Sequence, residues 1–86
     1  MEESLPIRSV SGASLGQIVR WPPSTDAKAH SHPDNRYGFV ISGTFYHGYG
    51  DKFDVKRLEV RPVGTFFTEP AGVGHFGATK DEGAVL

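Results

Sequence analysis

Residues 64–79, GTFFTEPAGVGHFGAT, carry the most informative spacing of the chain: Gly64, five residues, Pro70-x-Gly72, two residues, His75. Pro70 cannot donate a ladder hydrogen bond, and the glycines allow sharp turns and close approach of backbone. The residues on both sides of this loop are rich in strand formers. The stretch therefore predicts two short strands joined by a loop that fixes the position of His75.

A second stretch, residues 29–43 (AHSHPDNRYGFVISG), contains His30-x-His32 just before a predicted turn. Side chains at i and i+2 of a strand point to the same face, so both imidazoles can aim at one point. Their reach suits a metal–nitrogen bond of about 2.1 Å. By itself a His-x-His pair is more often a surface pair, but His75 offers a third imidazole. Three imidazoles with open positions would form a reactive metal centre.

The His-x-His stretch resembles the first motif of the cupin superfamily, which reads Gly, five residues, His-x-His, three or four residues, Glu, six residues, Gly. This chain has His30-x-His32, three residues, Arg36, six residues and Gly43, with Ser24 at the place of the first glycine. The resemblance therefore includes the histidines but not the glutamate.

Residues 64–79 resemble the second cupin motif, which reads Gly, five residues, Pro-x-Gly, two residues, His, three residues, Asn. Gly, Pro, Gly and His all stand at these spacings, and Thr79 stands where Asn is expected. The two motifs and the segment between them span residues 24–79. The resemblance implies an all-β fold, the cupin double-stranded β-helix or jelly-roll barrel, with one domain over residues 1–86 and an N-terminal arm over 1–13.

The resemblance also implies a metal held by His30, His32 and His75 in a cavity between two sheets. Cupins usually add a glutamate, and here Arg36 takes that position, so we expect three histidines without a carboxylate. A guanidinium beside the ion would add to its positive charge. Three alternatives remain open: Arg36 pairs with an acid such as Asp34 or Glu69, it clamps an anionic substrate group bidentately, or the metal affinity is weakened or lost.

Outside the motifs, apolar alternation broken by Gly and Pro predicts further short strands and no amphipathic helix. His47 matches no motif position, and we interpret it as structural or exposed. The N-terminal segment 5–10, or a neighbouring subunit, is expected to cover an open sheet edge. Strands are expected at 15–21, 29–32, 36–46, 55–61, 65–68, 75–79 and 84–86, with polar turns at 24–28, 33–35, 48–51, 62–64 and 80–83.

Composition excludes several classes of protein. The chain has 86 residues, a net charge of −1 and no cysteine, so disulfides and thiolate sites are excluded. It has no basic stripe that would favour nucleic acid, and no apolar run of about 20 residues that would span a membrane. The acidic N-terminus lacks a signal-peptide pattern, so a cytoplasmic location is expected.

These observations predict a metal-dependent cupin enzyme, of dioxygenase, isomerase or lyase type, that acts on a small oxygen-rich or anionic compound. The alternative is a non-catalytic module that binds a small molecule, with or without metal. Imidazole ligands suit Fe, Zn, Ni and Cu, Mn more often sits with carboxylates, and we favour Fe(II) or Zn. We expect Arg36 to bind substrate and the chain to form a homodimer, because an uncovered strand edge invites aggregation. The chain ends soon after His75, so a C-terminal truncation is also considered.

Overall fold

Antiparallel β-strands dominate the computed structural model, which describes residues 3–8 and 14–17 as backbone only and residues 18–86 in full. No α-helix occurs within these residues, which confirms the all-β class, and none of their segments forms a helix that could cross a membrane. The strands are β1 (Glu3–Arg8), β2 (Ser14–Trp21), β3 (Asp26–His30), β4 (Arg36–Phe39), β5 (Ser42–Gly43), β6 (Phe45–Tyr49), β7 (Glu59–Arg61), β8 (Phe66–Glu69), β9 (His75–Ala78) and β10 (Ala84–Val85), with one 3₁₀ turn, η1 (Val55–Arg57).

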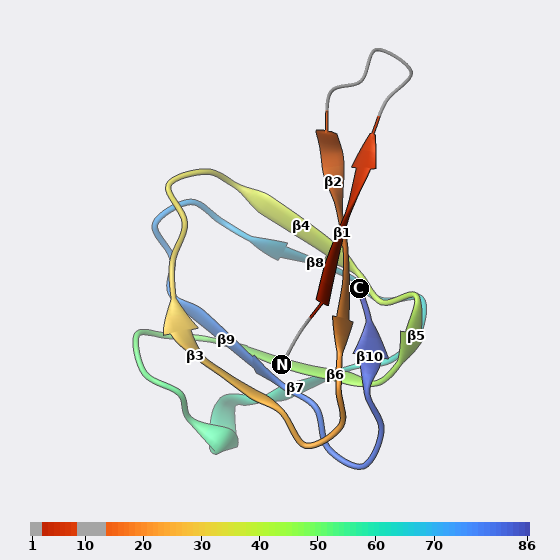
Figure 1. Cartoon of the computed structure of the whole chain (residues 1–86). Helices are drawn as coiled ribbons and strands as arrows, with labels where there is room; N and C mark the ends of the chain where they lie inside the picture. The colour runs from red at the N-terminus through yellow and green to blue at the C-terminus, as the bar shows by residue number, and fades with distance from the viewer. Residues whose placement is uncertain (1–2, 9–13) are drawn as a thin grey trace.

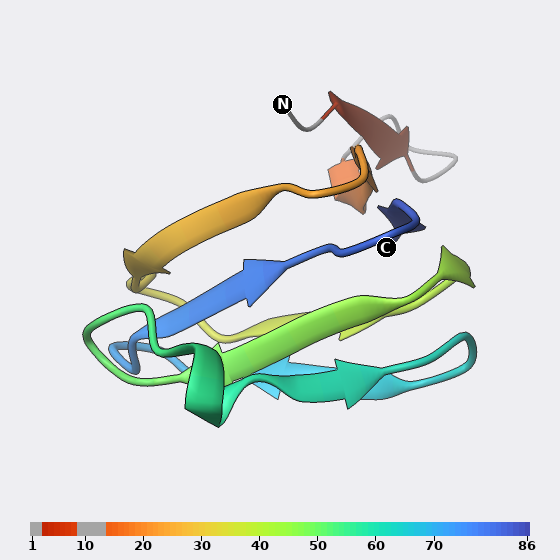
Figure 2. The same ribbon diagram turned by 90° about the horizontal axis from the view of Figure 1, so that it is seen from below.

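The strands form three sheets with the orders β1-β2-β10-β5, β3-β9-β6-β7 and β4-β8. In Figure 1 the β4–β8 ribbon lies across from the β3-β9-β6-β7 sheet, and the β1-β2-β10-β5 sheet forms a third side. Figure 2 shows β3, β9, β6 and β7 side by side as one twisted layer. Across the described part of the chain, the hydrogen-bonded ladders do not close into a barrel.

The segments that carry the two sequence motifs lie against each other. β3 pairs with β9, so that His30 stands opposite His75, and β4 pairs with β8, so that Arg36 stands opposite Glu69. Two strands of the first motif, β3 and β4, therefore have partners from the second, whereas β5 pairs with β10. This pairing brings residues more than thirty positions apart in sequence to one end of the molecule.

The core lies between the sheets and is mainly aromatic. Trp21, Phe45 and Phe67 are almost fully buried, and the Trp21 and Phe45 rings meet edge-on at 4.9 Å between centroids. Each such side chain stabilises the fold by roughly 1.5–3 kcal/mol. Gly38 makes room for this packing, because a Cβ there would lie 2.2 Å from the Phe67 ring.

Several predicted elements are confirmed. β2 ends immediately before the Pro22–Pro23 pair, and β8 and β9 flank the Gly/Pro loop of residues 70–74. The N-terminal segment adds β1 to the outer edge of β2, as one of the two expected covers for an open edge. Residues 1–2 and 9–13 of the predicted arm (1–13) lie outside the described part of the chain.

The predicted single strand over 36–46 is wrong, because three strands occupy that stretch. The chain leaves the β4–β8 ribbon at Val40, whose N–H binds Thr65, and enters another sheet at Ile41, whose N–H binds Val85. Gly43 continues the corner with φ +76°. The corner also shifts the alternation of buried side chains, because the even-numbered Val40 is fully buried before the corner and the odd-numbered Phe45 is buried after it.

Two smaller boundaries are also corrected. Residues 55–57 form the 3₁₀ turn η1 instead of a strand, because the Asp54 side chain accepts a hydrogen bond from Lys56 N–H and caps the turn. β3 begins at Asp26, inside the predicted turn of residues 24–28, and ends at His30. His32 therefore lies two residues beyond the strand.

Candidate metal centre

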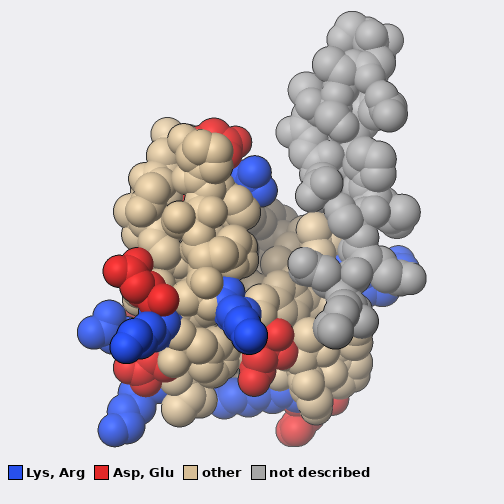
Figure 3. Space-filling model, turned by 60° about the vertical axis from the view of Figure 1, so that its left-hand side comes forward, with Lys and Arg blue, Asp and Glu red and all other residues tan. Residues whose placement is uncertain are grey.

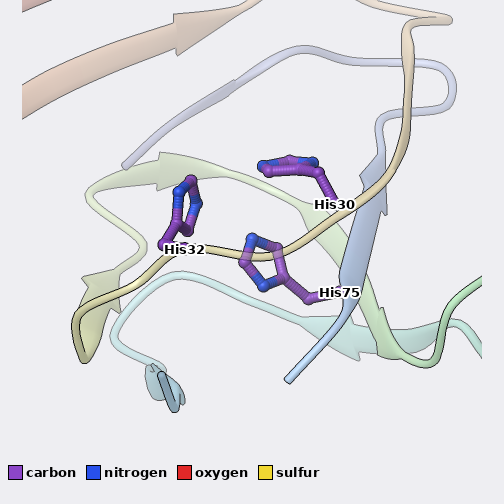
Figure 4. Close-up of side chains that lie close together, drawn as sticks. All are labelled: His30, His32 and His75. Atoms are coloured by element: carbon purple, nitrogen blue, oxygen red, sulfur yellow. The ribbon is translucent and has the colours of Figure 1, made fainter. Parts of the chain in front are cut away.

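The three predicted histidines come together at one end of the β3-β9-β6-β7 sheet. His30 ends β3, His75 begins β9, and His32 follows in the segment that leads to β4 (Figure 4). The ring centroids lie 4.5 Å apart for His30 and His75 and 4.9 Å apart for the other two pairs. One nitrogen of each ring lies within 4.8 Å of the corresponding atoms of the other two, so the group can hold a metal ion.

Two hydrogen bonds join the loop that follows β3 to the loop that precedes β9. The N–H of Gly72 donates to the carbonyl of His32 at 2.9 Å, and the N–H of Ala71 donates to Oδ1 of Asn35 at 2.8 Å. Gly72 has φ +75°, a conformation that glycine adopts without steric cost. The Pro/Gly loop of the second motif thereby fixes the backbone around both His32 and His75.

The hydrogen bonds of His30 prepare it for metal binding. Its Nδ1 lies 2.9 Å from the carbonyl oxygen of Lys28, and a carbonyl can only accept, so Nδ1 carries the proton. Nε2 is then left with a free lone pair. Metal-bound histidines usually donate their other ring N–H to such an acceptor, which fixes tautomer and ring orientation.

His75 is buried, and its surroundings favour the neutral ring. Burial is the main cause that lowers the pKa of His75 below its ordinary value of 6.5, and the negative charge of Glu69 only partly offsets it. A backbone hydrogen bond with Val73 also offsets the effect of burial, but to a smaller extent than Glu69. A neutral imidazole is the form that binds metal, so His75 is suited to that role.

Glu69, the last residue of β8, is the functional candidate that the motif comparison missed. Its Oε2 accepts a hydrogen bond from Nε2–H of His47 at 2.8 Å, and its Oε1 lies 3.4 Å from Nε2 of His75. Burial alone would raise the pKa of this carboxyl, but the His47 hydrogen bond and the nearby histidines outweigh it, and the net pKa lies below 4.5. Glu69 is therefore an ionised carboxylate directly beside His75, one of the three histidines.

His47, which the sequence left as structural or exposed, is buried and lies outside the group of three. Its side chain is 1% exposed and is enclosed by the rings of Phe67, Tyr49 and Phe45. In the sequence, the only indication that Glu69 points toward His47 is strand alternation, which places Glu69 on the same face as the buried Phe67.

Arg36 lines the cavity into which the histidines open, but its guanidinium pairs with an acid. Its Nε lies 3.4 Å from Oδ1 of Asp34, and both side chains are about half exposed or more. Of the alternatives left open by the sequence, pairing with Asp34 is the one present in this structure. An exposed pair of this kind contributes about 0–1 kcal/mol, so a ligand can displace it at low cost.

The histidines open into a cavity of about 790 Å³ between the sheets. One end of its lining is polar and contains the three histidines, Glu69 and Arg36, whereas the rest is largely apolar, with side chains such as Ile18, Val19 and Leu86. On the face of the molecule shown in Figure 3, acidic and basic side chains lie next to one another. The cavity therefore suits a small molecule with one polar end.

The chain was also compared with known proteins. No protein-family model matches it, and no curated protein is significantly similar to it.

Proposed function

We propose that the chain is a cupin-type metalloenzyme that acts on a small oxygen-rich or anionic compound. The observation that carries this proposal is the convergence of His30, His32 and His75, from two distant segments, on one point of a cavity. The pairing of the first-motif strands with the second-motif strands supports the cupin jelly-roll type as the fold.

The donor set fits a divalent transition metal. His30 and His75 are held with ring nitrogens available, and an ionised carboxylate lies beside them. Imidazole nitrogen suits Fe(II) and Zn(II), which we take as the leading candidates, ahead of Ni, Cu and Mn. When bound, such an ion polarises a substrate oxygen or activates dioxygen.

The residues of the chain have separate roles in this proposal. The apolar wall of the cavity excludes water and packs against the body of the substrate. Arg36, at the polar end, turns from Asp34 to an anionic group of the substrate and orients it, because a guanidinium binds carboxylates bidentately. The partly buried Glu69 carboxylate holds negative charge next to the metal ligands.

The predominance of apolar side chains in the cavity favours a second candidate, a non-catalytic module that binds a small molecule. Metal content and oxygen uptake distinguish the two. Chain purified without a histidine tag is analysed for metals and then mixed with a panel of diketones, phenols and keto acids. Stoichiometric metal with substrate-dependent oxygen uptake or product formation supports the enzyme. Saturable binding without turnover supports the module.

We also propose a homodimer, formed through the outer face of the β4–β8 ribbon. Tyr37, Phe39 and Phe66 lie on this face and are 66%, 52% and 62% exposed. Phe39 is opposite Phe66 in the ladder, and the rings of Tyr37 and Phe66 stack at 6.0 Å. These aromatics expose roughly 400 Å² of apolar surface, about half of what one partner buries in a typical stable interface. The face carries no charged side chain at these ladder positions, which suits a second copy of the same surface.

A further inference from the structure

Glu69 lies beside His75, at the edge of the group of three histidines, so a turn of its side chain can bring its carboxylate toward an ion bound there. It lies on β8 on the same face as the buried Phe67, and its side chain is only 18% exposed. Its Oε1 is 3.4 Å from Nε2 of His75, with no hydrogen bond between them. Two ligand atoms about 2.1 Å from a tetrahedral ion lie about 3.4 Å apart, so this spacing is that of two ligands sharing a metal.

The other oxygen of Glu69 is held in place by His47. Nε2–H of His47 donates to Oε2 at 2.8 Å, and the buried imidazole is fixed between aromatic rings. Tyr49 donates from its hydroxyl to the carbonyl of Thr68, which fixes the backbone next to Glu69. A hydrogen bond from a rigid neighbour to the second oxygen is the usual way in which proteins orient a ligating carboxylate.

The charge of the proposed metal site also favours a carboxylate ligand. Three neutral imidazoles leave both positive charges of a divalent ion uncompensated, and the glutamate position of the first cupin motif holds Arg36. Arg36 stands directly opposite Glu69 in the β4–β8 ladder, but its guanidinium is drawn toward Asp34. The negative charge of Glu69 is therefore directed to the histidines and is not neutralised by its cross-strand neighbour.

We propose that Glu69 is the fourth metal ligand, binding through Oε1, and that His47 is the residue that positions it. The carboxylate thus comes from β8 instead of from the first motif, and a rotation of its side chain toward the three rings completes the site. This inference rests on the proposed metal site and specifies its donor set.

The test compares Glu69→Gln with wild type and with Glu59→Gln, an equivalent change on β7 at a side chain that is 69% exposed. Zn(II) affinity is measured by competition with a chromophoric chelator, and the Co(II)-loaded proteins are compared by visible absorption. We expect Glu69→Gln to lower Zn(II) affinity by about 100-fold and to change the Co(II) spectrum, with Glu59→Gln within about twofold of wild type. A Glu69→Gln variant with wild-type affinity and spectrum overturns the proposal.

His47 gives a test of positioning. His47→Phe keeps the aromatic packing but removes the donor, and we expect about tenfold weaker Zn(II) binding. His47→Gln retains an N–H donor and should recover most of that loss. Equal affinity in both variants would show that His47 does not position the carboxylate.

Wild-type chain supplies a readout that does not depend on how a variant folds. The infrared difference spectrum between Zn(II)-loaded and metal-free protein should contain a shifted carboxylate stretch, and its absence overturns Glu69 as a ligand. If the wild type binds no metal at all, the proposed function fails. If it binds metal without this shift, only the fourth-ligand proposal fails.

Discussion

Arg36 and Glu69 face each other across the β4–β8 ribbon, yet each side chain is engaged elsewhere. Nε of Arg36 lies 3.4 Å from Asp34, whereas the Glu69 carboxylate contacts His47 and His75. An acid and a base are thus placed side by side on the cavity lining but serve different neighbours. Because the two side chains do not pair with each other, the Glu69 carboxylate can bind a metal and the Arg36 guanidinium can bind an anion.

Replacing Arg36 should therefore strengthen metal binding. Arg36→Gln removes a half-exposed positive charge from the cavity, and with strong screening by water we expect Zn(II) affinity to rise by about three- to tenfold. Lys80→Gln is the control, because Lys80 follows the far end of β9 and lies over Tyr46. Chelator competition measures both variants. Weaker binding by Arg36→Gln would show that Arg36 supports the metal site instead of opposing it.

The packing of Gly38 against Phe67 should be essential to the ribbon that carries Glu69. In Gly38→Ala the new Cβ would lie 2.2–2.7 Å from three carbons of the Phe67 ring, so the ribbon and the core must separate. We expect unfolding free energy to fall by about 1–3 kcal/mol. Urea denaturation measures the change, with the exposed Ser42→Ala as control. Recovery of stability in the Gly38→Ala, Phe67→Leu double variant would identify the clash as the cause.

Strand alternation and motif spacing predict the histidine group but not the residues around it. The expected period-two alternation and the Pro/Gly loop of residues 70–74 identify all three histidines, although β3 ends at His30 and His32 lies in the segment after the strand. Glu69 could not be recognised in this way, because its contacts with His47 on β6 and His75 on β9 depend on how the β4–β8 ribbon packs against another sheet. Packing between sheets is a tertiary property that a local sequence pattern does not contain.

The corner at residues 40–44 shows the same limit. Residues 36–46 alternate like one strand, but Val40 and Ile41 bond to different sheets, and the buried set changes from even to odd positions between Val40 and Phe45. Within this stretch, Gly43 is the residue whose type fits the corner, because its positive φ favours glycine. The all-β class follows from short strands and turns, whereas the corners between sheets depend on tertiary hydrogen bonds.

Thr79, at the position of the expected Asn, should stabilise the corner at the start of β3. Its hydroxyl donates to the carbonyl of Pro22 and accepts from the N–H of Thr25, and the side chain is 3% exposed. Thr79→Val leaves both backbone groups without this partner and should cost about 1–3 kcal/mol. Thr79→Ser keeps the hydroxyl and should lose clearly less. Equal unfolding free energies of the two variants in thermal or urea denaturation would contradict this role.

The outer aromatic face of the β4–β8 ribbon should control assembly. Phe66→Ser removes the ring that stacks on Tyr37 and stands opposite Phe39 in the ladder, so we expect the homodimer to dissociate. Light scattering coupled to size exclusion should give twice the chain mass for wild type and the single-chain mass for the variant. Val55→Ser is the control, since Val55 is as exposed at 65% but lies on η1. A monomeric wild type at high concentration would contradict the proposed dimer.

Metal stoichiometry in tag-free protein tests the central claim most directly. The chain is stripped with a chelator, reloaded with Zn(II) or with Fe(II) under anaerobic conditions, freed of excess metal and analysed by elemental analysis. His30→Ala and His75→Ala are treated in parallel, because these residues meet across the β3–β9 ladder. We expect about one ion per wild-type chain and a strong reduction in both variants. Wild type without bound metal, or folded variants with wild-type metal content, would contradict convergence of these imidazoles on a shared ion.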